Sequence, residues 1–443
     1  MTFTDVAEVG SPDEMVVYEH GWQSWSPTGT YAATATSPRP ADRDRQILGF
    51  RPEKALPGSG FQGEGLLAVS PRGGGMARIW AATDPTLEVA SIRARLVDRR
   101  LVVSADGPVT ETVVTAPDLE TALAGWAGGY GNPYAGGRAG SIPPVWCSWY
   151  HYFAGVTAAD ILENLRSAGH LGLPIGVIQL DDGYSEDLGD WLRTTARFGL
   201  PLAAVAAEIR ATGRRAGIWT APLLVGERSR LAAERPEWLV GAADAGWNWG
   251  QRLRVLDLTH PDAAAHLHGV FSSLAAWGFD YFKLDFLYAG ALPGRRHQDA
   301  SPIAAYREGL RLIRDAVGTG ATLLGCGAPL LPSLGLVDAM RVGPDVATHY
   351  EPAPGGDLSA PSGRAAALAV RARAFQHGRF WINDPDCLIA RPEMERREEW
   401  AATVERWGGL RASGDQLAAL DGWGLETTRH LLVPASPWPL VDS

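Results

Sequence analysis

Cysteine is scarce in this 443-residue sequence, which contains only Cys147, Cys326 and Cys387. Three is an odd number, and all three lie in or beside predicted strands, which favours a reducing cytoplasm over a disulfide-stabilised secreted fold. The ten histidines are scattered, and no His-x-x-x-His or Cys-x-x-Cys pair has the spacing of a metal site. We therefore expect neither a metal nor another cofactor.

An excess of basic residues and long apolar runs are also lacking. The net charge is −10, so nothing indicates nucleic acid or an anionic membrane as a partner. No uninterrupted apolar run is long enough to span a bilayer, and Met1–Val6 has neither the basic nor the apolar part of a signal peptide. We expect a protein without a leader peptide that acts in the cytoplasm.

Two common catalytic motifs are missing as well. There is no Gly-x-Ser-x-Gly elbow, and the glycine run Gly73–Gly75 lies in a β-rich region, far from a strand-to-helix turn that could cradle a phosphate. Tryptophan, in contrast, is abundant, with seventeen residues. Most of them are expected in cores, but tryptophan faces also stack on the C–H faces of sugars and other ring ligands.

The sequence divides into two regions of different pattern. Residues 1–140 contain short β-rich pieces separated by Gly, Pro, Ser and Asp turns, which predicts a small antiparallel, sandwich-like β domain. The glycine-rich segment Gly128–Gly137 is predicted to be a loop at the domain boundary. Strands and helices alternate over residues 141–430, and residues 431–443 form a short carboxy-terminal tail.

The alternating region has the pattern of an α/β protein with a parallel sheet. Eight strands with intervening helices are the count for a (β/α)8 (TIM) barrel. Thr157 is predicted to cap the first barrel helix, and an insertion after the third strand is predicted to be partly helical over Glu227–Leu239. The predicted strands are Pro144–Trp149, Ile175–Leu180, Ala216–Thr220, one within Gly278–Tyr288, Thr322–Cys326, Ala339–Val342, Phe380–Asn383 and Gly409–Ala412.

The fourth predicted strand carries two opposite charges on one face. Because side chains alternate along a strand, Lys283 and Asp285 share a face while Phe282, Leu284 and Phe286 share the other. Two buried charges cost several kcal/mol each unless they are paired or used. One interpretation is a structural ion pair in the core. The other is a carboxylate at the carboxyl end of a barrel strand, directed at a substrate and tuned by the ammonium group.

Further acidic residues follow other predicted strands. They are Asp181 and Asp182 after the second strand, Asp345 after Arg341 on the sixth, Asp384 and Asp386 after the seventh, and Asp415 after the eighth. Any one of them alone could simply cap a helix. Together, at one mouth of a barrel, they predict a binding site for a polyhydroxylated ligand. A carboxylate pair without a metal is the usual equipment for glycoside hydrolysis.

Several motifs, in this order along the chain, resemble the α-galactosidases of glycoside hydrolase family 36 and share features with family 27 of the same clan. The resemblance covers about residues 20–30 and 143–425. The motifs are Asp181-Asp182-Gly183-Tyr184, Trp219-Thr220-Ala221-Pro222, Leu256-Asp257-Leu258-Thr259-His260-Pro261, Phe282-Lys283-Leu284-Asp285 and Asn383-Asp384-Pro385-Asp386.

The resemblance implies a retaining exo-α-galactosidase that forms a covalent galactosyl-enzyme intermediate on a galactoside or oligosaccharide substrate. Asp285 matches the family's nucleophile and Asp345 its acid/base, while Asp181 and Asp182 match the carboxylates that hold galactose hydroxyls. The other expected substrate-binding residues are Lys283, Arg341, Trp149, Trp219, Cys326, Trp22 and Trp25.

The sequence departs from the family pattern at two points near the expected sugar. The glycine-rich segment after the fifth strand is here Gly325-Cys326-Gly327-Ala328-Pro329, and Ala221 replaces a glutamate after the third strand. Three alternatives therefore stay open: an α-N-acetylgalactosaminidase, a galactosyl transferase of the raffinose-synthase type, and a non-catalytic carbohydrate-binding protein. The oligomeric state also stays open, a homo-oligomer included.

The amino-terminal motif Gly21-Trp22-Gln23-Ser24-Trp25 is predicted to lean over the barrel mouth. Two tryptophans three residues apart in one strand would point to opposite faces and could not enter the same core. Ser26-Pro27-Thr28-Gly29, which follows, favours a turn. We expect one of the two indoles to cover the sugar, with burial of both in the β domain as the alternative.

Overall fold

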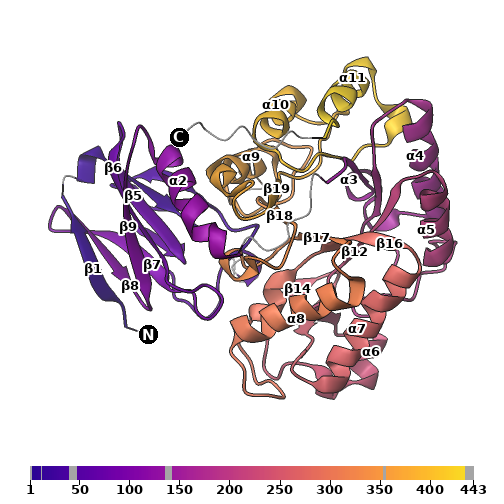
Figure 1. Ribbon diagram of the computed structural model, residues 1–443, viewed down its shortest axis with the longest axis horizontal. Helices are drawn as coiled ribbons and strands as arrows, with labels where there is room; N and C mark the ends of the chain where they lie inside the picture. Colours follow the sequence, from indigo (N-terminus) through magenta and orange to yellow (C-terminus); the bar gives the residue numbers. More distant parts are fainter. Residues whose placement is uncertain (1, 11, 39–46, 135–141, 353–355, 435–443) are drawn as a thin grey trace.

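The computed structural model describes residues 2–10, 12–38, 47–134, 142–352 and 356–434. A β-sheet domain and a larger α/β domain lie side by side, in indigo to purple and in magenta to yellow respectively (Figure 1). The predicted domain boundary at residue 140 and residues 435–443 of the predicted tail lie outside the described residues. Within these ranges, no helix combines the length and the apolar content needed to cross a bilayer.

The β domain is the predicted antiparallel sandwich. One sheet has the order β1-β8-β7-β4 and the other β3-β2-β5-β6-β9. Alternate residues of the second sheet face different partners: Leu67 and Trp80 pack in the sandwich core, whereas Ala68 and Ile79 belong to the core shared with the barrel. The strands are β1 (Thr4–Val9), β2 (Met15–Glu19), β3 (Gly29–Ala32), β4 (Phe61–Glu64), β5 (Leu66–Pro71), β6 (Gly75–Ala82), β7 (Ser91–Val97), β8 (Arg100–Ala105) and β9 (Val109–Ala116).

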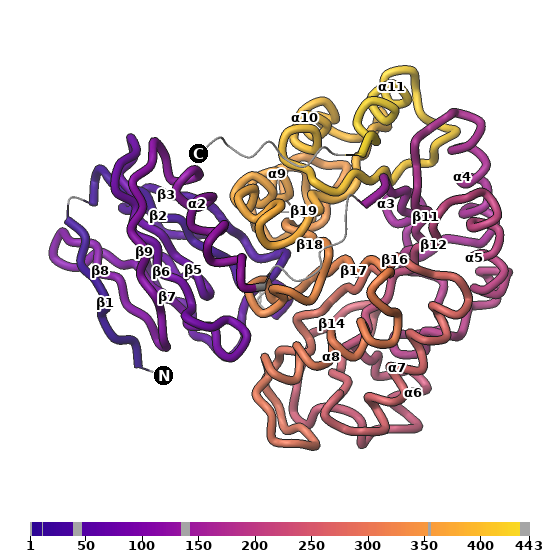
Figure 2. The backbone as a smooth tube through the Cα atoms, viewed as in Figure 1, coloured from indigo at the N-terminus to yellow at the C-terminus, as the bar shows by residue number. Residues whose placement is uncertain are grey.

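Helix α2 (Leu119–Gly131) lies between the sandwich and the barrel (Figure 2) and corrects one prediction. The loop predicted from Gly128 is helical as far as Gly131. A Cβ at Gly131 would lie 2.7 Å from the ring of Phe380, so the helix packs on the barrel at a distance that only glycine permits. The loop prediction was wrong for Gly128–Gly131, because this tertiary contact outweighs the low helix propensity of glycine.

The second domain is a (β/α)8 barrel, as predicted. Its strands pair in parallel in the order β19-β18-β17-β16-β12-β11-β10-β20. The last seam is closed by a parallel bridge between Leu388 and Ser413, and the Leu388 amide donates to the carbonyl of Ala412 (2.8 Å). The strands are β10 (Val145–Cys147), β11 (Val177–Leu180), β12 (Arg215–Thr220), β16 (Phe279–Leu284), β17 (Thr322–Gly325), β18 (Ala339–Arg341), β19 (Ile382–Asp384) and β20 (Ala412–Ser413).

Helices cover the outside of the barrel. Thr157 caps the first long one, and its hydroxyl and amide form a capping box with Asp160. The helices of this domain are α3 (Trp149–Tyr152), α4 (Ala158–His170), α5 (Leu202–Ala211), α6 (Arg230–Glu234), α7 (Pro261–Ala276), α8 (Pro302–Val317), α9 (Gly363–Ala372), α10 (Arg397–Trp407) and α11 (Gly422–Leu431).

The insertion after the third barrel strand contains a small antiparallel sheet that the sequence did not predict. Strands β13 (Leu224–Gly226), β15 (Gln251–Val255) and β14 (Trp247–Asn248) pair in that order. Short helical turns occur in the predicted partly helical range, at Arg230–Glu234 and Pro236–Trp238. The β14–β15 hairpin brings Trp249 to the barrel mouth.

The segment Gly21–Thr28 of the β domain attaches directly to the barrel. Gln23 forms an isolated β-bridge with Pro329, and the Ser24 amide donates to the carbonyl of Ala328 (3.2 Å). The fully buried guanidinium of Arg373 donates to the carbonyls of Gln23, Ser24, Ser26 and Val342 and to the hydroxyl of Thr28. Arg373 thus links the segment Gly21–Thr28 to Val342, directly after strand β18.

Candidate active site

Strand β16 delivers its charged face to the barrel interior as predicted. Phe282 points outward, where its ring packs on Phe271 of α7 at 5.6 Å. Lys283 and Asp285 are 4% and 7% exposed, respectively. The two-residue period explains this alternation as far as Leu284. Phe286, predicted on the outer face, lines the cavity instead, because the left-handed turn after the strand ends the alternation.

Lys283 forms ion pairs with carboxylates from two strands. Its Nζ lies 2.9 Å from Asp181 Oδ2 and 3.9 Å from Asp285 Oδ2. Burial opposes the charge of Lys283, but Asp181 and Asp285 raise the pKa of its ammonium group well above the usual value. The ammonium group therefore stays positive between the two carboxylates.

Asp285 is held at both carboxylate oxygens. The indole Nε1 of Trp219 donates to Oδ2 (2.9 Å), and the Phe286 amide donates to Oδ1 (2.8 Å). Phe286 itself has φ 51°, a left-handed conformation that is rare for a bulky residue. The turn after β16 thus orients the carboxylate at the cost of local backbone strain.

Asp181 and Asp182 follow β11 and have different surroundings. Asp181 accepts from Gln179 Nε2 (2.6 Å) and from the thiol of Cys147 (3.3 Å). Asp182 accepts from the Gly183 amide (2.7 Å) and from the indole of Trp249 (2.8 Å).

The protonation of Asp182 is sensitive to these neighbours. Burial raises the pKa of Asp182 to about 6, and the charges of Asp181 and Asp285 add to the rise. The hydrogen bonds from Trp249 and Gly183 oppose it.

On the other side of the site, Arg341 binds three carboxylates. Its Nη1 lies 3.0 Å from Asp345 Oδ1, its Nε 2.9 Å from Asp384 Oδ2, and its Nη2 2.9 Å from Asp386 Oδ1. Asp386 also accepts from the hydroxyl of Tyr150 and from the Val346 amide (2.9 Å for Val346).

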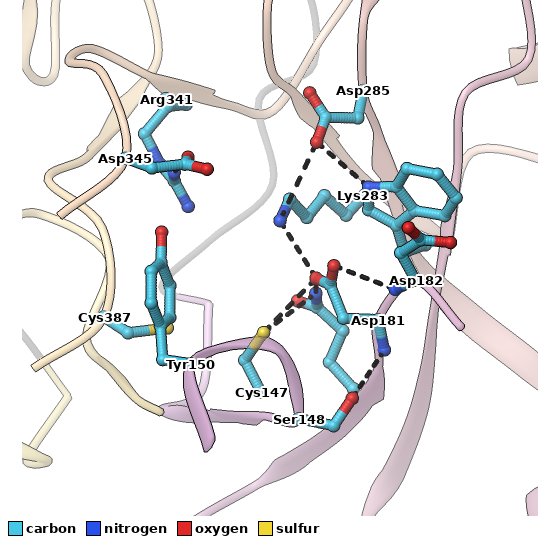
Figure 3. A network of polar contacts seen from close by, with 12 residues as sticks. Cys147, Ser148, Tyr150, Asp181, Asp182, Lys283, Asp285, Arg341, Asp345 and Cys387 are labelled. Carbon is cyan, nitrogen blue, oxygen red and sulfur yellow. Dashed lines mark hydrogen bonds and ion pairs between the residues drawn. The ribbon is translucent and has the colours of Figure 1, made fainter. Parts of the chain in front are cut away.

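Asp345 is the candidate that faces open space. Its side chain is 35% exposed, compared with 3% for Asp384 and 0% for Asp386. The surrounding protein atoms raise the pKa of Asp345, while Arg341 and Lys283 oppose the rise and Asp285 adds to it. In Figure 3 its carboxylate points toward Lys283 and Asp285, which come from the opposite side. A proton held on Asp345 is therefore directed at the space between them.

A cavity of about 230 Å³ adjoins Asp345. The β domain, the β14–β15 hairpin and the barrel loops all contribute to its wall. The lining residues include Trp25, Leu48, Asn248, Phe286, Asp345 and Pro361. The cavity thus has mainly apolar walls, and Asp345 is the acidic residue among those that line it. Apolar and aromatic walls with a polar group of this kind suit a sugar ligand.

The two amino-terminal tryptophans have different places. Trp25 is partly buried, lines the cavity and packs edge-on against Phe286 at 4.8 Å. Trp22 is 6% exposed, lies in the shared core and has the Arg51 guanidinium 4.6 Å from its ring centroid. The structure therefore brings only Trp25 to the site.

Cys326 and Trp149 also differ from each other: the Cys326 thiol lies close enough to Asp285, Arg341 and Lys283 to feel their charges, whereas no contact within the described part of the chain links Trp149 to them. Cys326 is fully buried directly after β17, and burial raises the pKa of its thiol well above the usual value, so it stays neutral. Trp149 packs on Phe153 at 5.3 Å, and no contact in the described residues joins it to the carboxylates. Its neighbour Tyr150 reaches Asp386 instead.

The sequence did not indicate Tyr150, Phe286 and Trp249 as site residues, whereas Asp384 and Asp386 were expected among the acidic residues at the barrel mouth. The pattern around Trp249 contained a signal. Trp249-Gly250 separates two short extended pieces, and a glycine in a two-residue connection is typical of a hairpin.

Known proteins resemble this chain in sequence and in structure. The Melibiase family model matches residues 143–302. The α-galactosidase TtGalA from Thermus thermophilus, solved in complex with stachyose, is 30% identical with a TM-score of 0.82, covering 97% of this chain and 92% of that chain. The family 36 α-galactosidase AgaA from Geobacillus stearothermophilus is 14% identical with a TM-score of 0.64, covering 96% of this chain and 61% of that one.

A curated relative matches over a shorter range. The bifunctional α-galactosidase/sucrose kinase AgaSK from Mediterraneibacter gnavus is 28% identical over 102 residues, which is 21% of this chain and 10% of that protein. The match thus spans a small part of the relative's length. The match to TtGalA, in contrast, covers nearly the whole of both chains. The chain therefore belongs to the α-galactosidases of glycoside hydrolase family 36.

Proposed function

We propose that the protein is a retaining exo-α-galactosidase with Asp285 as the nucleophile and Asp345 as the acid/base. The observation that carries the proposal is the contrast between the two carboxylates. Asp285 is oriented by Trp219 and Phe286 beside the Lys283 ammonium group, whereas Asp345 faces the cavity with a raised pKa. A carboxylate ready to attack and a carboxylic acid ready to donate a proton are the two groups that this reaction needs.

The proposed reaction has two steps. Asp285 attacks the anomeric carbon as the glycosidic C–O bond breaks, and Asp345 gives its proton to the leaving oxygen. The Asp285 charge is then neutralised in the ester, so its contribution to raising the pKa of Asp345 disappears. Asp345 can now accept a proton from water, which attacks the anomeric carbon and releases Asp285.

Asp181 and Asp182 are proposed to bind the axial 4-hydroxyl and the 6-hydroxyl of galactose. Asp181 pairs with Lys283, Asp182 accepts from Trp249, and carboxylates are strong acceptors for sugar hydroxyls. TtGalA was solved with p-nitrophenyl α-D-galactopyranoside and with stachyose. A galactoside or galactose-containing oligosaccharide is thus the substrate class we propose here. The proposed place of action is the cytoplasm, in keeping with three buried free cysteines.

The nucleophile is tested by substitution and rescue. Asp285→Gly should lose many orders of magnitude in hydrolysis of an aryl α-galactoside, and added azide should yield β-galactosyl azide because it enters from the vacated face. Asp299→Gly, at an exposed position, is the control. Near-normal activity of Asp285→Gly without azide, or only α-configured azide, would contradict the assignment.

Substrate identity is tested on the wild type. Aryl α-galactoside and aryl α-N-acetylgalactosaminide are compared side by side, with and without a sugar acceptor. We expect release of galactose to water to dominate. Preference for the acetamido sugar, or transfer to the acceptor, would instead support one of the two enzymatic alternatives.

A further inference from the structure

The tip of the β14–β15 hairpin holds a tryptophan in a conformation that tryptophan rarely adopts. Asn248 pairs with Gln251, which leaves Trp249 and Gly250 as a two-residue turn. Both have positive φ, 50° and 67°, the pattern of a type I′ turn. Glycine, asparagine or aspartate is usual there, so a tryptophan at this position is strained. Strain of this kind persists where the surroundings enforce it, and it gathers at functional sites.

Several contacts enforce the position of Trp249. Its carbonyl accepts from Arg228 Nη2 (3.0 Å), which fixes the tip of the hairpin. Its ring lies 4.9 Å from Phe286 and 6.4 Å from Trp219, the two residues that donate to Asp285. Its indole Nε1 donates to Asp182 Oδ2 at 2.8 Å.

These contacts go beyond what covering the site would require. A phenylalanine could pack on Phe286 equally well, but only an indole also supplies an N–H at the ring edge. The neighbouring Trp247 shows the contrast, because it lies two residues away on the same hairpin and is 53% exposed. The contacts of Trp249 therefore indicate that it acts as a hydrogen-bond donor and not only as an apolar cover for the site.

We propose that Trp249 is a positioning residue for Asp182, which holds this carboxylate as an oriented, ionised acceptor for a sugar hydroxyl. The proposal rests on the proposed function, since Asp182 is assigned to galactose binding there. Trp249 and the Gly183 amide each donate to a different oxygen of Asp182. The carboxylate plane is thereby set, and the remaining lone pairs are available to the ligand.

The inference has a consequence for pH dependence. The titratable groups near Asp182 are Asp181, Asp285 and Tyr184, with Lys283 between the first two. Burial and both carboxylates raise the pKa of Asp182, and the indole hydrogen bond lowers it. Removing the indole N–H must therefore raise this pKa further. Because protonation turns one oxygen of Asp182 into an O–H donor and weakens the group as an acceptor, activity at low pH should fall.

The test compares Trp249→Phe with the matched control Trp247→Phe over the pH profile of kcat/KM for an aryl α-galactoside. In Trp249→Phe the acid limb should move up by about one pH unit, which corresponds to the loss of one hydrogen bond to a charged group. Relative to wild type, the loss at low pH should then be about tenfold greater than at pH 8, and KM should rise more than kcat falls. Trp247→Phe should retain the wild-type profile.

A second variant protects the test against misfolding. Trp249→Gly relieves the positive φ and lacks the donor as well, so it should move the acid limb in the same direction while the hairpin keeps its turn. If the wild type cleaves the galactoside but the acid limb is unchanged in both Trp249 variants, the role of Trp249 is refuted and the proposed function is not affected. A wild type that does not cleave the galactoside would overturn the proposed function instead.

Discussion

At the scale of single residues, Asp345 shares one guanidinium with two carboxylates that face no solvent. Asp384 and Asp386 occupy the Nε and Nη2 positions of Arg341, so Asp345 receives only Nη1. A carboxylate with Arg341 to itself would be strongly favoured as the anion. Sharing weakens that preference, so the loss of hydration beside the protein, together with the charge of Asp285, raises the pKa of Asp345. Asp384 and Asp386 thus help to keep Asp345 protonated, as a proton donor must be.

The role of Asp345 as a proton donor predicts a dependence on the leaving group. Asp345→Asn should slow hydrolysis of an alkyl α-galactoside by about 10²- to 10⁴-fold, because a poor leaving group needs the proton. The first step with a dinitrophenyl galactoside should be much less affected. Single-turnover kinetics with both substrates provide the measurement. Equal losses on the two substrates would show that Asp345 is not the donor.

At the scale of elements, the segment Gly21–Thr28 carries one indole into the cavity wall and one into the core. Trp25 lines the cavity and Trp22 is buried in the core, although the two lie three residues apart in one turn-rich segment. A tryptophan face against a sugar contributes about 1–3 kcal/mol, by analogy with stacking on nucleic acid bases.

The two indoles should respond differently to truncation. Trp25→Ala should raise KM for an aryl α-galactoside by roughly 5- to 150-fold, which corresponds to that energy. Trp22→Ala should instead lower the free energy of unfolding by about 3–5 kcal/mol, with little change in the kinetics of the folded fraction. Steady-state kinetics and denaturant unfolding of both variants measure the contrast. Two variants that behave alike, both as core deletions, would refute the role of Trp25 at the mouth.

The barrel could be predicted from the sequence because its strands are short apolar runs with polar residues at their carboxyl ends. Asp285, Asp345 and Lys283 were predicted at one mouth in this way, from the alternation of side chains and the fold, while the roles of the two aspartates rested on the family resemblance. The position of Trp249 depends on a hairpin with positive φ at both turn residues, which local propensity disfavours. Helix α2 depends on the contact of Gly131 with Phe380. Both are decided by packing between distant segments, so a local pattern could not reveal them.

At the scale of the whole molecule, Arg373 connects the two domains. It is fully buried, and burial lowers the pKa of its guanidinium to about 10. Its acceptors in the β domain are carbonyl and hydroxyl oxygens of the segment that carries Trp25. The position of the cavity wall therefore depends on a contact between domains that lies beneath it.

Replacing Arg373 should affect stability and catalysis together. Arg373→Met should cost more than about 3 kcal/mol, because several buried oxygens lose their donor at about 1–3 kcal/mol each. In the folded fraction KM should rise, since Trp25 is no longer fixed. Arg371→Met, on the exposed side of α9, is the matched control. Thermal unfolding and kinetics measure both effects, and a destabilised variant with unchanged KM would show that Arg373 does not position the wall.

Three aspartates pair with the one guanidinium of Arg341, so aspartates outnumber cations around the pocket. Asp181 and Asp285 flank the single charge of Lys283, Asp182 adjoins Asp181, and three carboxylates surround Arg341. Such an arrangement produces a negative electrostatic potential in a pocket with largely apolar walls, where it attracts positive charge more strongly than in water. Glycoside cleavage passes through an oxocarbenium-like state, so the potential favours the transition state over the neutral sugar. By the same reasoning, a protonated amine shaped like galactose should bind this pocket more tightly than galactose itself.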